Sequence, residues 1–220
     1  MTHSKLGLIK KLIALKTISS LIIVIILVVL VGCNNALIED ISIEKTKDIS
    51  TFQQYMLDEI NFARTKPAEY AELRLKAENE TSKDNGSYSY LKNSTQVEAI
   101  SFNQALNQSA SDYASFLAEK NLLEHNADGT PLKRAIRAGF TGTSTAENIA
   151  AASENCYNPV LNSNSAAIEF VRTLIIDEGV ADVGHRLIIL NAKYKTVGIG
   201  FTQNSATPTL NYVVQDFGNL

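Results

Sequence analysis

Two histidines and a glutamate between them are the residues of this chain whose types and order could support chemistry. His125 lies in the segment LLEHN, His185 lies in the segment GHR, and Glu147 lies in the segment AENIA. Imidazole nitrogens and carboxylate oxygens bind Zn²⁺ or a similar divalent ion, with water in the open positions. A carboxylate beside each imidazole could equally orient the ring without touching the metal. The three residues are therefore a candidate metal or ligand site.

The same residues also have a plainer interpretation. An isolated histidine is more often a hydrogen-bonded structural residue than a ligand, and Glu147 could cap a helix that begins near Asn148. Other catalytic arrangements find no support in the sequence. No Ser-His-Asp or Cys-His set stands out, and there is neither a His-Glu-x-x-His pair nor a phosphate-binding glycine loop. The residue types thus favour a metal over an activated nucleophile.

Apolar residues at helical spacing predict most of the elements that would position these side chains. The clearest stripe runs from Phe102 to Leu117 in steps of three or four residues. It predicts a helix over about 101–121, which ends just before His125. Capping residues and prolines mark where further helices begin, and glycines mark where they end. These are expected over about 50–60, 67–76, 131–139 and 167–179.

Alternating residues near the end of the chain predict the sheet. Apolar side chains alternate with small or polar ones over 197–201 and again over 210–214. A turn around 204–208 joins the two runs as an antiparallel hairpin. The polar segments 79–95 and 151–165 show no period and are expected to be loops. Helices that flank a small sheet give the fold class α+β.

Taken together, these segments resemble the CAP superfamily, named for cysteine-rich secretory proteins, antigen 5 and pathogenesis-related 1 proteins, and also called the SCP-like domain. The similarity spans about 51–217, and the order and spacing of its motifs make it specific. The stretch DEGV at 177–180 resembles a bacterial subset of the family. The other matching motifs are Asn61 and Arg64, His125-Asn126, AENIA around Glu147, Gly184-His185-Arg186, and VGIG at 197–200.

The resemblance implies a three-layer α-β-α sandwich with a small, mainly antiparallel sheet. It also implies a cleft lined by two histidines and two acidic residues, to which His125, His185 and Glu147 correspond directly. The chain lacks the disulfides and the tryptophan-rich motifs of the eukaryotic members. That difference weakens any transfer of their partner-specific functions to this chain.

The second acid of the cleft is left open by the sequence. The family usually carries it on the helix that precedes the second histidine. This chain offers Glu169, Asp177 and Glu178 there, and spacing does not choose among them. Thr173 is a further residue that could occupy the expected position.

Three functions follow from these residues and this resemblance. A binding module ranks first, with a cleft that takes a small apolar ligand, a divalent metal such as Zn²⁺, or a protein partner; the family is known for sterol and lipid binding. A metal-assisted hydrolase that acts on peptides or envelope polymers ranks second, with His125, His185 and Glu147 holding an ion that activates a water. A purely structural envelope protein ranks third. The sequence thus leaves open whether the chain is an enzyme and favours binding over catalysis.

The N-terminus has the order of parts of an export signal. Residues 1–16 carry four lysines and no acid, an apolar run of 11 residues follows from Leu21 to Val31, and LVGC closes it. The run is shorter than the roughly 20 residues that span a bilayer. The last four residues resemble a lipobox, in which Cys33 becomes the lipid-modified end of the mature chain. We therefore expect a signal peptide over 1–32, a flexible tether over 33–50 and a CAP domain over 51–220.

Bulk composition narrows the remaining classes. Loss of the signal peptide would leave 188 of the 220 residues, enough for one core, and would remove four lysines, taking the formal charge from −3 to −7. A mildly acidic chain argues against a nucleic-acid partner. With Cys33 lipidated, Cys156 has no partner within the chain, so no disulfide framework is expected. The sequence thus predicts a lipid-anchored, extracytoplasmic protein of the cell envelope that contacts the membrane through Cys33.

Overall fold

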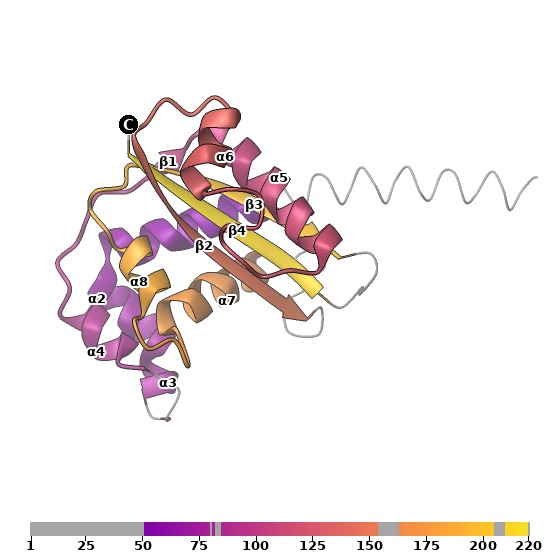
Figure 1. The fold of residues 1–220 in the computed structure, drawn as a ribbon. Helices are drawn as coiled ribbons and strands as arrows, with labels where there is room; N and C mark the ends of the chain where they lie inside the picture. The colour runs from indigo at the N-terminus through magenta and orange to yellow at the C-terminus, as the bar shows by residue number, and fades with distance from the viewer. Residues whose placement is uncertain (1–50, 80, 82–84, 154–162, 205–209, 220) are drawn as a thin grey trace, which may run out of the picture. The chain divides into compact units, whose positions relative to one another are not determined.

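The computed structural model describes residues 51–79, 81, 85–153, 163–204 and 210–219, all within the unit Asp48–Leu220 (Figure 1). The expected signal peptide, the tether, Cys33 and Cys156 lie outside the described residues. The first helix covers 51–65. The remaining elements, in chain order, are α2 Pro67–Tyr70, the π-helix η1 Ala71–Leu75, α3 Lys76–Asn79, α4 Ser87–Lys92, β1 Ser101–Phe102, α5 Gln104–Lys120, α6 Pro131–Arg137, β2 Ser144–Ser153, α7 Ser163–Ile176, α8 Gly184–Ile189, β3 Thr196–Gln203 and β4 Leu210–Asn219.

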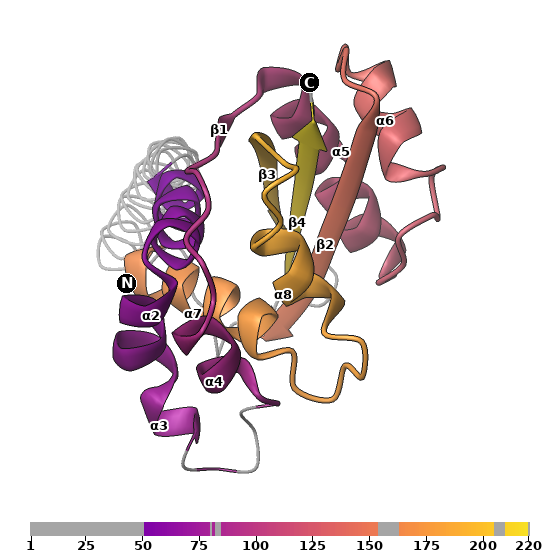
Figure 2. The same ribbon diagram turned by 90° about the vertical axis from the view of Figure 1, so that its left-hand side faces the viewer.

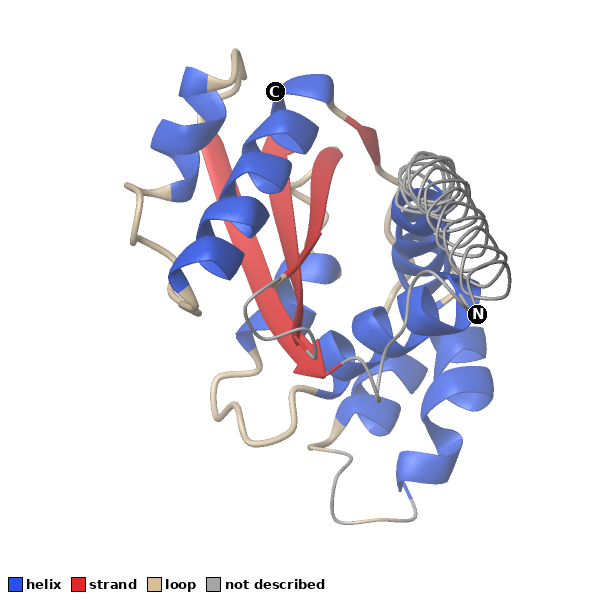
Figure 3. Cartoon of the chain, turned by 90° about the vertical axis from the view of Figure 1, so that its right-hand side faces the viewer, coloured by secondary structure: helices blue, strands red, loops and turns tan. Residues whose placement is uncertain are grey.

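The sheet has the strand order β1-β3-β4-β2, so β4 is central and β2 lies at one edge. The long strands β2 and β3 each pair with β4 in antiparallel register, while the two-residue β1 pairs with β3 in parallel. Helices lie on both faces of the sheet (Figures 2 and 3). The α+β class and the mainly antiparallel sheet expected from the sequence are confirmed.

Apolar packing joins the helices to the sheet on each face. On one face the aromatic ring of Phe52 meets those of Phe170 and Phe201, at centroid distances of 6.0 and 5.1 Å. Helices 51–65 and α7 therefore share a core with β3. On the opposite face the buried side chains of Tyr113 and Leu117 in α5 pack with those of β2 and β4. Burial of such side chains contributes about 1.5–3 kcal/mol each, so both faces hold the sheet in place.

Helix α5 approaches β3 more closely than any side chain between them would allow. A Cβ atom built on Gly198 would lie 2.0 Å from the carbonyl carbon of Leu106, and one on Gly200 would lie 2.0 Å from the carbonyl oxygen of Ala110. The Asn107 side chain also accepts a hydrogen bond of 2.8 Å from the backbone N–H of Ile199. The absence of a side chain at these two glycines thus allows the backbone of α5 to approach the backbone of β3 this closely.

Four expectations about local structure were wrong. The expected loop at 151–165 begins with the last three residues of β2 and ends with the first three residues of α7. Segment 79–95 is not a loop throughout, because α4 forms around the fully buried Leu91. Phe102 belongs to β1, since Asn103 caps α5 by accepting from the N–H of Leu106 at 3.1 Å. Glu147 does not cap a helix but lies within β2, which runs on to Ser153. The alanine-rich sequence of β2 has weak intrinsic strand preference, and its pairing with β4 decides its structure.

The other expected helices are present. Pro67 occupies the first turn of α2, although the helical run extends through a π turn to Asn79 rather than stopping at Lys76. Thr130 caps α6, and Gly139 follows its end with a φ of 96°. Helix α8 begins at Gly184 and carries His185 in its first turn. The hairpin strands β3 and β4 pair as expected, while most of the turn between them lies outside the described residues.

Candidate functional site

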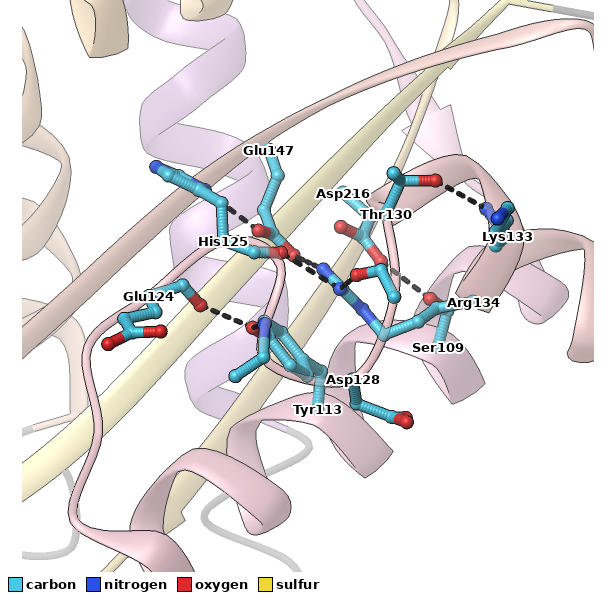
Figure 4. A network of polar contacts seen from close by, with 12 residues as sticks. Ser109, Tyr113, Glu124, His125, Asp128, Thr130, Lys133, Arg134, Glu147 and Asp216 are labelled. Atoms are coloured by element: carbon cyan, nitrogen blue, oxygen red, sulfur yellow. Dashed lines mark hydrogen bonds and ion pairs between the residues drawn. The ribbon is translucent and has the colours of Figure 1, made fainter.

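His125 lies in the segment between α5 and α6 and faces β2 (Figure 4). Its Nδ1 atom lies 2.8 Å from the Oε1 atom of Glu147. The Glu147 side chain is only 1% exposed, whereas that of His125 is 47% exposed. A buried carboxylate therefore holds one nitrogen of a ring whose remainder faces solvent. Since Nδ1 is engaged, the nitrogen left for a ligand is Nε2.

Arg134 of α6 forms a buried ion pair with Glu147 and neutralises its charge. Its Nη2 atom donates to Oε2 of Glu147, and its Nη1 atom donates to the backbone carbonyl of His125 at 2.9 Å. The guanidinium lies over the ring of Tyr113, 3.4 Å from the centroid. Both side chains of the ion pair are buried, so each charge depends on the other for compensation.

The backbone of the His125 segment is fastened by Tyr113. The phenol hydroxyl donates to the carbonyl of Glu124 and accepts from the N–H of Ala127 at 3.2 Å. Asn121 ends α5 in the left-handed region with a φ of 52°, which turns the chain toward this contact. The long helix thus positions His125 through its last two turns.

His185 forms a second pair of the same kind with Asp177. Its Nδ1 atom lies 2.5 Å from Oδ1 of Asp177, and the other carboxylate oxygen accepts from the backbone N–H of Arg186 at 3.2 Å. The Asp177 side chain is 1% exposed and that of His185 is 24% exposed. Asp177 itself adopts a left-handed φ of 57°. The bend after α7 therefore brings its carboxylate back to the start of α8.

Among the three acids left open by the sequence, Asp177 is the one that contacts His185. Glu169 instead forms an ion pair of 2.6 Å with Arg172 on the same helix. Glu178 is exposed. Helical spacing could not decide this, because Asp177 lies just after the end of α7 and its direction depends on the left-handed turn.

The two histidine–acid pairs stand on either side of the edge strand β2. Successive side chains of a strand point to opposite faces, and Glu147 and its neighbour Asn148 do so here. Glu147 meets His125, while the side-chain amide of Asn148 donates to the carbonyl of His185 at 3.4 Å and to Gln215 at 3.1 Å. One short piece of β2 therefore anchors both halves of the site.

Three polar residues around Glu147 were not recognised from the sequence: Ser109, Arg134 and Asp216. Asp216 is directly opposite Glu147 in the β2–β4 register and is fully buried. Its hydrogen-bonded partner is Ser109 of α5, whose hydroxyl donates to Oδ2 at 2.7 Å. A signal was present, since position 216 continues the alternation of Leu210, Tyr212 and Val214 with an acid.

Burial changes the acidity of Asp216. It raises the pKa of this carboxyl to about 8, and the negative charge of Glu147 acts in the same direction, while the Ser109 hydrogen bond and the Arg134 charge oppose the shift. At pH 7 Asp216 is therefore mainly a neutral acid. The cluster then holds one negative charge, on Glu147, against the positive charge of Arg134.

In the described part of the chain, each histidine–acid pair leaves one ring nitrogen without an acidic partner. Each imidazole is oriented by a carboxylate and presents Nε2, the arrangement that supports metal-binding histidines. Among the described residues, no group of three or more His, Cys, Asp or Glu side chains is close enough to hold a metal ion. The described residues therefore show two separate histidine–acid pairs and no assembled metal site.

Comparisons with known proteins identify a family. The profile of the cysteine-rich secretory protein family, CAP, matches residues 57–217. Among proteins with curated functions, none matches this chain. No helix in the described part of the chain has the length and apolar character needed to cross a bilayer.

Solved structures with a similar fold include three that are far from this chain in sequence. An extracellular protein containing a SCP domain from Bacillus anthracis shares 18% identity with a TM-score of 0.43, over 56% of this chain and 35% of that protein. The chain thus spans about a third of its length. An outer surface protein from Borrelia burgdorferi shares 18% identity with a TM-score of 0.43, over 70% of this chain and 88% of that protein. The structure of NaASP2 with Zn²⁺ shares 16% identity with a TM-score of 0.46, over 76% and 78% respectively.

Proposed function

Since this chain belongs to the cysteine-rich secretory protein (CAP) family, we propose that it is a lipid-anchored binding domain of the cell envelope whose His125 and His185 take up a divalent cation. The observation that carries the proposal is the repeated pairing of a partly exposed imidazole with a buried carboxylate. His125 is paired with Glu147 and His185 with Asp177, in both cases through Nδ1. In both pairs the carboxylate is buried and is compensated by its hydrogen-bond partners, and in both pairs Nε2 is the ring nitrogen left for a ligand.

The number of ligands favours binding over hydrolysis. Catalytic zinc sites use three protein ligands and one water, and structural sites use four. Two imidazoles hold an ion less firmly, which suits an exchangeable metal. A bound ion would polarise a substrate oxygen or acidify its water. Glu147 and Asp177 are not placed to accept a proton from that water, because both side chains are buried and hold the Nδ1 side of each ring, away from Nε2. Hydrolysis of peptides or envelope polymers is therefore the second candidate.

The anchor belongs to the same proposal. The short apolar run and the LVGC segment support lipidation at Cys33, which would hold the domain at the membrane surface. Stable anchoring needs more than one acyl chain or a second membrane signal.

Calorimetric titration of Zn²⁺ into the full chain in detergent is expected to show one ion bound per chain. His125→Ala and His185→Ala should each abolish the one-to-one heat, because the remaining imidazole is a single ligand. Glu124→Gln changes an exposed neighbour of His125 and serves as the control that retains binding. A folded wild-type chain that takes up no Zn²⁺, or both variants binding as wild type does, would contradict the proposal.

Asp177→Asn is expected to weaken Zn²⁺ binding about 10- to 100-fold, the usual cost of losing a carboxylate that orients a metal-binding histidine. The amide keeps the shape of the side chain but no longer supplies the negative charge that makes the ring basic. The matched control is Glu178→Gln, which removes the adjacent, exposed acid. Equal loss of affinity in the two variants would show that the effect is one of general charge rather than of the His185–Asp177 pair.

A further inference from the structure

We propose that Asp216 is a positioning residue that remains protonated and donates its acid hydrogen to the carboxylate of Glu147, which in turn orients His125. The inference deepens the proposed function, on which the role of His125 rests. Asp216 and Glu147 are cross-strand partners in the β2–β4 register, and both side chains are buried. Figure 4 shows Glu147 between His125 and Asp216, with the Arg134 guanidinium close to both carboxyl groups.

Hydrogen-bond accounting at Asp216 supports the protonated form. Its Oδ2 atom accepts from Ser109, but its Oδ1 atom is buried and has no donor among the described residues. An ionised carboxylate there would carry an unsatisfied oxygen beside a second negative charge, which is costly in a buried place. A protonated Asp216 removes both problems, because its hydroxyl can donate to Glu147, the partner that raises its pKa.

The charged groups around Asp216 are few. Glu147 faces it from β2 and Arg134 from α6. The other packed elements contribute the uncharged Ser109 of α5 and Gly198 of β3. Glu147 therefore receives three donors: Asp216, Arg134 and His125. Its carboxylate cannot rotate without breaking one of these bonds, which is how Asp216 acts on the imidazole without touching it.

A polar cavity lies beside the residues that contact Asp216. Ser109, Tyr113 and Arg134 line a cavity of about 210 Å³ that also contacts the exposed Asp128 and Arg137. A water in such a polar cavity has several partners. Loss of the Asp216 proton would place a second negative charge next to Glu147, the carboxylate that contacts His125.

The pH dependence of stability follows from the same proton. The carboxyl of Asp216 has an ordinary pKa of 3.8, and in the folded chain its pKa is about 8. Between these values the folded chain holds a proton that the unfolded chain releases, so the group favours folding at low pH and loses that effect as pH rises toward 8. Its contribution raises the unfolding constant by up to about tenfold per pH unit in that window. Asp216→Asn, which keeps a neutral donor, should remove this dependence.

The deciding experiment is nuclear magnetic resonance of histidine ring nitrogens in the full chain in detergent, without metal. The chain has only three histidines, so the signals are few. The His125 signal should show an inflection near pH 8 in the wild type, which Asp216→Asn should abolish while leaving the ring signal at pH 7 in place. Ser109→Ala should move the inflection to higher pH, because the serine hydrogen bond lowers the pKa of Asp216. The His185 signal, which reports on the Asp177 pair, is the internal control.

Three results would overturn the inference. The first two are an inflection near pH 8 that persists in Asp216→Asn and a wild-type His125 signal that shows no inflection there. A displaced His125 ring signal at pH 7 in a folded Asp216→Asn chain would also contradict it. Because no metal is added, these results are independent of Zn²⁺ binding. A chain that binds no Zn²⁺ but shows the paired shifts would reject the proposed function and retain the role of Asp216.

Discussion

Replacing Glu147 with alanine is expected to lower the free energy of unfolding by about 3–5 kcal/mol, the cost of breaking a buried ion pair by removing one partner. Arg134 would keep its charge in a place where its side chain is only 3% exposed. His125 would lose its acceptor in the same step. Urea denaturation followed by circular dichroism measures the change, since the chain has no tryptophan for fluorescence.

The control for this variant is Glu119→Ala, which breaks the exposed pair between Glu119 and Lys120 and should leave the denaturation curve almost unchanged. A companion double variant, Glu147→Ala with Arg134→Ala, should cost less than the two single changes added together, because it leaves no unpaired charge. Loss below about 1 kcal/mol in Glu147→Ala would mean that water reaches Arg134 and that the pair is not buried in solution.

Gly200→Ala is expected to cost about 3 kcal/mol, the upper part of the usual range for overpacking a filled interior. The new Cβ atom would lie 2.0 Å from the carbonyl oxygen of Ala110, and a helix backbone cannot move aside as a flexible side chain can. Helix α5 must therefore shift as a whole. Thermal denaturation measures the cost, and Zn²⁺ affinity should fall as well, because α5 carries Tyr113, which fastens the His125 segment.

The matched control is Gly184→Ala, at the first residue of α8 and directly before His185. There the nearest atom to the added Cβ would be 3.5 Å away, at the side chain of Asp182, and the backbone φ is not left-handed. Alanine also favours helix over glycine. This variant should be as stable as the wild type or slightly more stable. Equal destabilisation of the two glycine variants would show that the α5–β3 contact is looser than described.

The sequence predicts those elements whose pattern is contained in one continuous segment, and it fails where an element depends on a distant partner. The helices with long apolar stripes and the β3–β4 hairpin could be predicted, because their apolar residues repeat at a regular spacing over enough residues to identify the element. Strand β2 was missed because four of its ten residues are alanine and its partner β4 lies about 60 residues further along the chain. No local pattern carries information about pairing at that distance.

The candidate site divides in the same way. His125, His185 and Glu147 stand out by residue type and by the family resemblance. The identity of the acid beside His185 depends on a left-handed turn at Asp177, a conformation that non-glycine residues rarely adopt. Arg134 and Asp216 were missed because their roles arise from burial, which the sequence indicates only through an acid placed where an apolar residue is expected. Their polar partners come from different elements of the fold.

The central position of β4 has a consequence for the order in which the molecule can assemble. This strand follows every other described element in the chain, yet both long strands β2 and β3 pair with it. A chain emerging from a ribosome or a translocation channel with its N-terminus first therefore has no long strand pair until β4 appears. The residues that pair between β2 and β4 are about 60 positions apart, and such non-local pairing makes folding slow. A copy without β4 would expose the unpaired edges of β2 and β3, which makes it prone to aggregation.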